Sequence, residues 1–106
     1  MQIEISDEAK DDIAEIYRYI AKNSLRYASE TVNNIYDSID YLELSPYLGR
    51  YVHEFEDKKY REIFYKNYRI VYTIQEKEEI IYIHFVIHGK RNLITFFNKY
   101  ITENNL

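Results

Sequence analysis

The chain has 106 residues, which is enough for one domain with a single core and too few for a second domain. Hydrophobic residues make up 46% of it, and glycine and proline are scarce, which excludes a disordered or repetitive chain. The absence of cysteine excludes disulfides, thiol catalysis and cysteine-ligated zinc. We therefore expect residues 1–106 to form a single domain whose core draws on 13 Tyr and 5 Phe.

The net charge of -4 is unevenly distributed along the chain. Residues 1–57 carry 5 Lys/Arg and 13 Asp/Glu, whereas residues 58–106 carry 9 Lys/Arg and 5 Asp/Glu. The second half is the part that could face an anion, unless the asymmetry only reflects acidic helices beside a neutral sheet.

The N-terminus lacks the basic and apolar regions of a signal peptide. The longest apolar run, 80–87, is interrupted by His84 and is far shorter than the roughly 18 residues that a membrane span needs. We expect a cytoplasmic protein that makes no contact with a membrane.

The first half of the chain predicts two helices. An alternating segment at 2–5 predicts a short strand, and Ser6 follows it where the N-cap of a helix would stand. Apolar residues then recur at steps of three and four, which predicts a helix over about 7–22. A second apolar stripe with the same spacing predicts a longer helix over 25–42. The short connection makes the two helices an antiparallel hairpin.

The second half predicts a sheet. Ser45-Pro46 ends the helical hairpin, and beyond the loop the hydrophobic period changes to two. Segments 60–65, 68–75 and 80–88 are rich in Ile, Val, Tyr and Phe, and their short connections predict a three-stranded antiparallel meander. Helical spacing returns over about 91–103.

The expected fold class is α+β, with an N-terminal strand and a helical hairpin packed on an antiparallel sheet, in the order β-α-α-β-β-β-α. The hairpin must bury its apolar stripe on one face of the sheet.

Three segments of the predicted sheet carry a resemblance to a known family. They are Tyr60-Arg61, then Tyr-Arg-Ile-Val-Tyr at 68–72, then Val-Ile-His-Gly-Lys-Arg at 86–91. Their order and spacing, behind two acidic helices and a Ser-Pro-x-x-Gly loop, resemble the RelE/ParE toxin superfamily over nearly the whole chain. The resemblance implies a toxin of a type II toxin–antitoxin module, of the kind that stabilises plasmids, held inactive by a cognate antitoxin.

The resemblance also implies one of two targets, which are the mRNA in the ribosomal decoding site and DNA gyrase. It implies neither a metal nor another cofactor. Cleaving RNA through its 2'-hydroxyl needs a base, an acid and cations that stabilise the charge developing on the phosphate. The resemblance places Arg69 and Arg91 as two such cations, and His88 could act as the acid or base near neutral pH.

Other positions depart from the ribonuclease pattern. Where those enzymes carry a lysine, this chain has Glu62 or Ile63, and where a catalytic tyrosine is expected it has Phe97, which cannot transfer a proton. A pI near 5.4 is also unusual for a protein that binds ribosomal RNA. We therefore favour growth arrest through gyrase, with a ribosome-dependent mRNA endoribonuclease as the alternative and an inactive antitoxin-binding relative as a third possibility.

Four basic residues are candidates for contact with the target or the antitoxin: Arg61, Arg69, Lys90 and Arg91. We expect Arg69 and Arg91 to face a common open surface. Lys90 and Arg91 follow the last strand, where they could meet a phosphate or antitoxin carboxylates, or form a solvated turn.

Arg61 has two alternative placements that depend on the first hairpin of the sheet. A two-residue turn at 66–67 would put Arg61 on the face of Ile63 and Tyr72, with a structural role on tyrosine rings. A three-residue loop would put it beside Arg69.

His84 and His88 lie on one predicted strand. Strict alternation would place both on the face of Tyr82, opposite Ile81, Ile83, Phe85 and Ile87. No third ligand stands at a recognisable spacing, so we expect hydrogen-bonded residues of the sheet and no zinc site.

Overall fold

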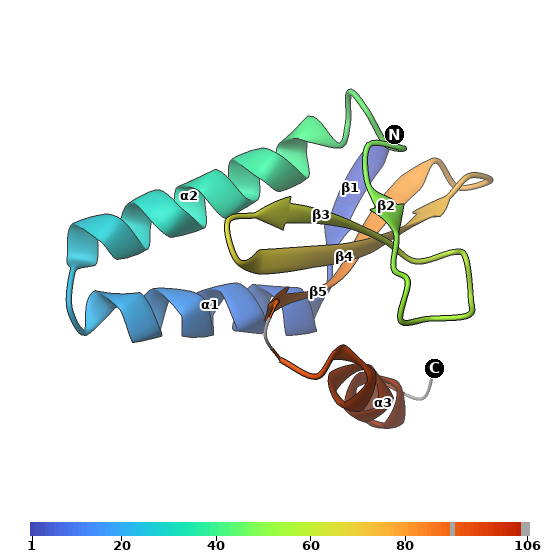
Figure 1. Cartoon of the computed structure of the whole chain (residues 1–106). Helices are drawn as coiled ribbons and strands as arrows, with labels where there is room; N and C mark the ends of the chain where they lie inside the picture. Colours follow the sequence, from blue (N-terminus) through green and yellow to red (C-terminus); the bar gives the residue numbers. More distant parts are fainter. Residues whose placement is uncertain (90, 105–106) are drawn as a thin grey trace.

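The computed structural model describes residues 1–89 and 91–104, so Lys90 lies outside the described residues. A helical hairpin covers one face of a sheet, and a third helix lies against the other (Figure 1). The elements, in chain order, are β1 (Gln2–Ile5), α1 (Asp7–Ala21), α2 (Leu25–Tyr41), β2 (Arg50–Tyr51), β3 (Arg61–Tyr65), β4 (Tyr68–Gln75), β5 (Ile80–His88) and α3 (Leu93–Asn104). The expected fold class is confirmed.

The sheet of the described residues has five strands in the order β1-β5-β4-β3-β2. The predicted antiparallel meander of β3, β4 and β5 is present. β1 adds to it in parallel with β5, with Ile3 opposite Ile81, which makes the sheet mixed. β2 is a two-residue edge strand beside β3, and it is too short to produce a periodic signal in the sequence.

Serine caps begin both helices of the hairpin. Ser6 Oγ accepts a hydrogen bond from the Ala9 N–H at 3.0 Å, as its position in the sequence predicts, and Ser24 Oγ does the same for Tyr27. Ser6 Oγ also donates to the His84 carbonyl at 2.7 Å, which ties the start of α1 to β5. None of the described helices combines the length and apolar character that crossing a membrane requires.

Two clusters of buried apolar residues lie on opposite faces of the sheet. The first packs the hairpin against the sheet and includes Ala9, Ile13, Ile35, Ile39, Leu42, Ile70, Tyr72, Ile81, Ile83 and Val86. The second lies beneath α3 and includes Val52, Phe55, Tyr60, Val71, Phe85, Ile87, Leu93 and Tyr100. The apolar stripes of the two predicted helices indicate the first cluster. The second does not follow from them, because α3 and the loop before β3 supply much of it from distant parts of the chain.

A bulge interrupts the pairing of β4 with β5. Val71 lies opposite Phe85 and Tyr72 lies opposite Ile83, so His84 is an extra residue on β5. An extra residue breaks the alternation of side chains between the two faces. Residues of β5 beyond the bulge therefore lie on the face opposite to the one that strict alternation predicts.

The loop that ends at Gly49 is fastened to the sheet by one tyrosine. The Tyr72 hydroxyl donates to the Pro46 carbonyl at 2.8 Å and accepts a hydrogen bond from the Gly49 N–H at 2.9 Å. A Cβ at residue 49 would lie 2.6 Å from this hydroxyl and 2.7 Å from the Glu62 carbonyl oxygen. Close approach to the sheet, rather than an unusual backbone angle, is why this position requires glycine.

Candidate functional site

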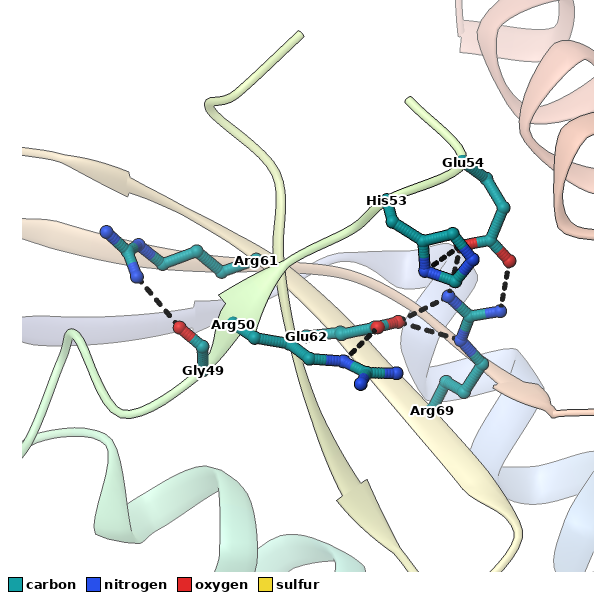
Figure 2. A network of polar contacts seen from close by, with 7 residues as sticks. All are labelled: Gly49, Arg50, His53, Glu54, Arg61, Glu62 and Arg69. Atoms are coloured by element: carbon teal, nitrogen blue, oxygen red, sulfur yellow. Dashed lines mark hydrogen bonds and ion pairs between the residues drawn. The ribbon is translucent and has the colours of Figure 1, made fainter. Parts of the chain in front are cut away.

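Arg69 of β4 lies in a buried network of charged side chains (Figure 2). Its residue exposure is only 6%. The Nε atom donates to Glu62 Oε1 at 2.7 Å, and the two terminal nitrogens donate to the two oxygens of Glu54 at 2.6 and 2.8 Å. The carboxylate of Glu54 therefore binds the guanidinium in a bidentate geometry, which is also the geometry in which arginine binds a phosphate.

Glu62 is the centre of this network. It is 1% exposed, and its second oxygen accepts a hydrogen bond from Arg50 Nε at 2.9 Å. The register that pairs Arg50 of β2 with Glu62 of β3 brings these two residues together. A buried carboxylate without partners is strongly destabilising, and here an arginine binds each oxygen.

The charges of the network balance one another. The Arg69 guanidinium holds the pKa of Glu54 below its ordinary value, and the hydrogen bonds to Glu54 and Glu62 raise the pKa of Arg69. The carboxylates of Glu54 and Glu62 thus offset the positive charges of Arg50 and Arg69. Arg69 consequently offers little positive charge to a phosphate outside the protein.

The register of the first hairpin decides between the two placements of Arg61. Tyr65 pairs with Tyr68 across a two-residue turn in which Lys66 has a positive φ of 50°. Arg61 consequently lies opposite Tyr72, as the two-residue alternative predicts.

Arg61 is held by a carbonyl and by tyrosine rings. Its Nη1 atom donates to the Gly49 carbonyl at 2.8 Å. The guanidinium carbon lies 4.4 Å from the ring centroid of Tyr51 and 5.1 Å from that of Tyr47. The predicted packing of Arg61 on tyrosine rings is confirmed, and the rings contribute cation–π attraction.

Exposed aromatic side chains lie beside each of the two arginines of the β2–β3 region, with Phe64 by Arg50 and Tyr51 by Arg61, and Figure 2 shows the two arginines extending in opposite directions. Tyr47, Leu48, Tyr51 and Phe64 are all exposed there, and the guanidinium of Arg50 lies 5.0 Å from the Phe64 ring centroid. We call this group, together with Arg50 and Arg61, the aromatic edge. Tyrosine and arginine are the residue types that dominate binding energy in protein–protein interfaces.

Arg91 lies in a different environment from Arg69. It lines a groove with Asp12, Glu15 and His88, and its guanidinium carbon lies 5.0 Å from the Phe96 ring centroid. The common open surface expected for Arg69 and Arg91 is not present in the described part of the chain, because the guanidinium of Arg69 is buried against Glu54 and Glu62. Lys90, the remaining candidate, lies outside the described residues.

The two histidines of β5 lie on opposite faces of the sheet, so the prediction of a shared face is wrong. His84 contacts Thr73 through Nε2 at 2.8 Å and the Tyr100 hydroxyl through Nδ1 at 3.0 Å. His88 lies beyond the bulge and stacks edge-on against Tyr68 at 5.6 Å. Burial lowers the pKa of His84 to about 4, which keeps its imidazole neutral at physiological pH.

Phe97, which replaces the tyrosine of the ribonuclease pattern, belongs to an aromatic cluster. Its ring centroid lies 4.2 Å from that of Phe55 and 5.0 Å from that of Tyr60. Phe97 therefore holds α3 against the sheet.

Within residues 1–89 and 91–104, no group of three or more His, Asp or Glu residues is placed to bind a metal ion.

Sequence reasoning missed the partnership of Glu62 with Arg50, Arg69 and Glu54. A signal was available, because Glu62 alternates with Tyr60 and Phe64 on one side of a strand. A carboxylate among apolar neighbours requires a cationic partner. The identity of that partner depends on strand register, which the sequence does not specify.

The fold is that of chains from toxin–antitoxin systems. A chain of the chromosomal ParDE system from P. aeruginosa has a TM-score of 0.70 and 16% identity, covering 85% of this chain and 97% of that chain. A chain of the toxin–antitoxin complex RelBE2 from Mycobacterium tuberculosis has a TM-score of 0.62 and 16% identity, covering 82% and 95%. At this identity the likeness is evidence for the fold alone.

The family described as "ParE toxin of type II toxin-antitoxin system, parDE" matches residues 3–93. The chain belongs to this family and is a ParE-type toxin of a toxin–antitoxin system. No curated protein sequence matches it significantly.

Proposed function

We propose that this toxin arrests growth by inhibiting DNA gyrase and that a cognate antitoxin neutralises it. The observation that carries the choice of target is the burial of Arg69 between Glu54 and Glu62. A nuclease that uses this arginine would need its guanidinium free to stabilise a phosphate. Family membership supports the toxin role itself.

Two further positions support gyrase over mRNA as the target. Glu62, one of the two residues that stand where the ribonuclease pattern has a lysine, is a buried anion, and Phe97 packs in an aromatic cluster where that pattern has a tyrosine. Neither side chain can supply the cation or the proton that RNA cleavage requires. Inhibition of an enzyme through protein contacts makes no such demand.

The aromatic edge supports an antitoxin partner. Its arginines, Arg50 and Arg61, lie on aromatic rings and expose an apolar surface with positive charge. A segment of the antitoxin with acidic and apolar side chains would complement this surface. The expected complex therefore includes carboxylates of the antitoxin near Arg61.

The test is to express the toxin from a tightly controlled promoter and to assay the purified protein. We expect the purified toxin to inhibit DNA supercoiling by gyrase. In cells we expect gyrase-dependent double-strand DNA breaks and intact mRNA. Arg61→Ala should weaken the antitoxin complex about tenfold or more, as for an interface hot spot. Codon-positioned mRNA cuts without an effect on gyrase would contradict the proposal, and growth unaffected by induction would favour an inactive relative.

One observation keeps RNA cleavage as a second candidate. His88 and Arg91 line the same groove, which is a pairing of a titratable group with a cation. The test is to assay the purified protein for RNA cleavage beside His88→Gln and Arg91→Ala variants. Cleavage by the unmodified protein that either substitution abolishes would favour this alternative.

A further inference from the structure

A groove runs between α1, the end of β5 and the start of α3. It consists of adjoining hollows of about 450 and 350 Å³, which share Asp12, Glu15 and Arg91 in their linings. We call it the α1 groove. Hollows of this size are within the range of ligand-binding pockets in proteins.

The charge of the α1 groove is negative. Four acidic residues of α1 line it, namely Glu8, Asp11, Asp12 and Glu15. They follow one another at steps of three, one and three, so successive turns of the helix each present a carboxylate. Arg91 and Lys99 are the cations of its lining. The acidic residues outnumber the basic ones, in contrast to the aromatic edge, where arginines predominate.

Asp12 connects the groove to the sheet. Its Oδ2 atom accepts a hydrogen bond from the Val86 N–H at 2.9 Å, at a point on β5 beyond the residues that pair with β1. Burial raises the pKa of Asp12 from 3.8 to about 7, against the opposing effects of this hydrogen bond and of Arg91. Asp11 and Glu15 on the same helix raise it further, so the charge of the groove depends on pH near neutrality.

The larger of the two hollows has a mainly apolar lining. Ile16 and Val86 contribute aliphatic surface, and Tyr68 contributes an aromatic ring. Tyr19 stands at the rim with 71% exposure. Rings next to carboxylates suit a side chain with an aliphatic stem and a cationic end.

We propose that the α1 groove binds a segment of a protein partner that carries lysine or arginine beside an apolar residue. The apolar residue would contact Ile16, the stem of the basic residue would lie on Tyr19, and its charged end would reach Glu15 or Asp11. The segment is opposite in charge to the one proposed for the aromatic edge. The inference does not depend on whether gyrase is the target, because it rests on the shape and charge of this groove.

The test uses fluorescent helical peptides of about 15 residues, a length at which helices begin to form in water. The first peptide has leucine on one face and lysine on the other. The second, control peptide has glutamate in place of lysine. We expect the lysine peptide to bind the full chain in a fluorescence anisotropy titration and the glutamate peptide not to bind. Stronger binding of the glutamate peptide, or no binding of either, would overturn the proposal.

Matched variants distinguish the groove from a general attraction to an acidic protein. Asp11→Asn with Glu15→Gln removes two charges from the groove, and Asp37→Asn with Asp40→Asn removes two from exposed positions of α2. We expect the first pair to weaken binding of the lysine peptide about tenfold and the second to change it less than twofold. Equal weakening by both pairs would show that only net charge matters.

A second comparison tests the aromatic rim. Tyr19→Ser should weaken binding of the lysine peptide several-fold. Tyr41→Ser, which alters an exposed tyrosine of α2, should leave this binding unchanged. Circular dichroism establishes that each variant is folded before its binding is measured. If the Tyr19→Ser variant binds the lysine peptide with unchanged affinity, the proposed contact of the peptide with the Tyr19 ring is wrong.

Discussion

The positive charge of Arg69 is neutralised by carboxylates inside the protein. Its guanidinium binds Glu54 and Glu62, and Glu62 in turn binds Arg50. Because each charge has a partner, the network fixes β2, β3 and the loop before β3 relative to one another. An arginine at a position that could hold a phosphate thus stabilises the fold, as a result of the carboxylates around it.

We expect Glu62→Gln to lower the free energy of unfolding by about 3 kcal/mol, because it leaves two arginines beside a buried neutral amide. Glu54→Gln is the matched control, and its cost should be about 1 kcal/mol because Glu54 is 23% exposed on its side chain. Urea unfolding at pH 7 measures both. Equal stability of Glu62→Gln and the unmodified protein would show that the buried pair contributes nothing.

Asp12 makes stability depend on pH in the direction opposite to most carboxylates. Its folded pKa of about 7 exceeds the ordinary value of 3.8. Between these values the folded state retains a proton that the unfolded chain has lost, so stability falls as pH rises through this window. We expect Asp12→Asn, which can still accept from Val86, to be more stable than the unmodified protein by about 1–2 kcal/mol at pH 8.

The advantage of Asp12→Asn should nearly vanish at pH 4, where the aspartate is protonated in the folded protein. Urea unfolding at pH 4 and pH 8 gives the comparison. A constant difference between the two proteins across this range would contradict the assignment of the titration to Asp12.

At the scale of elements, α3 is attached to the sheet through His84 and an aromatic cluster. The imidazole joins Thr73 of β4 to the Tyr100 hydroxyl of α3, and Phe97 packs on Phe55 and Tyr60. Because of the bulge at His84, Phe85 and Ile87 lie on the same face of the sheet as His84, toward α3. A single extra residue in β5 thereby determines how the last helix docks.

We expect acid to weaken this attachment. The folded pKa of His84 is about 4 and its ordinary value is 6.5, so stability that is present above 6.5 is lost as the pH falls toward 4. The loss should be about 2–3 kcal/mol, and His84→Gln should lack this part of the acid dependence. Urea unfolding of both proteins at pH 7.5 and pH 4.5 tests this, and parallel losses in the two would contradict it.

At the scale of the whole molecule, the basic second half does not become a basic face. Arg69 is neutralised in its network, Arg61 lies on tyrosine rings, and Arg91 lines the acidic α1 groove. Lys66 lies in the turn between β3 and β4, and Lys77 lies in the turn between β4 and β5. These five cations therefore do not follow one path that a nucleic-acid backbone could occupy.

We expect the isolated toxin to bind RNA or DNA weakly, with a dissociation constant above about 10⁻⁴ M at physiological salt. Fluorescence anisotropy with a labelled single strand at two salt concentrations measures both affinity and salt dependence. Micromolar binding that weakens steeply with salt would indicate a phosphate-binding surface and would favour the ribonuclease alternative.

Local patterns were sufficient to predict most elements. The apolar stripes of α1 and α2, the cap at Ser6 and the alternation of β3, β4 and β5 depend on neighbouring residues, and all of these elements are present. The packing of Arg61 on tyrosines was one of two alternatives, and the turn at Lys66 decided between them.

The sequence by itself determined the kinds of elements, their order and the apolar faces they bury, because these follow from the spacing of residues within each segment. Tertiary structure alone decided the partners of Arg69, the faces of His84 and His88 and the separation of Arg69 from Arg91. Each of these depends on strand register and on one bulge, which a shift by a single residue would reverse. Register is set by the packing of the whole sheet and not by any segment within it.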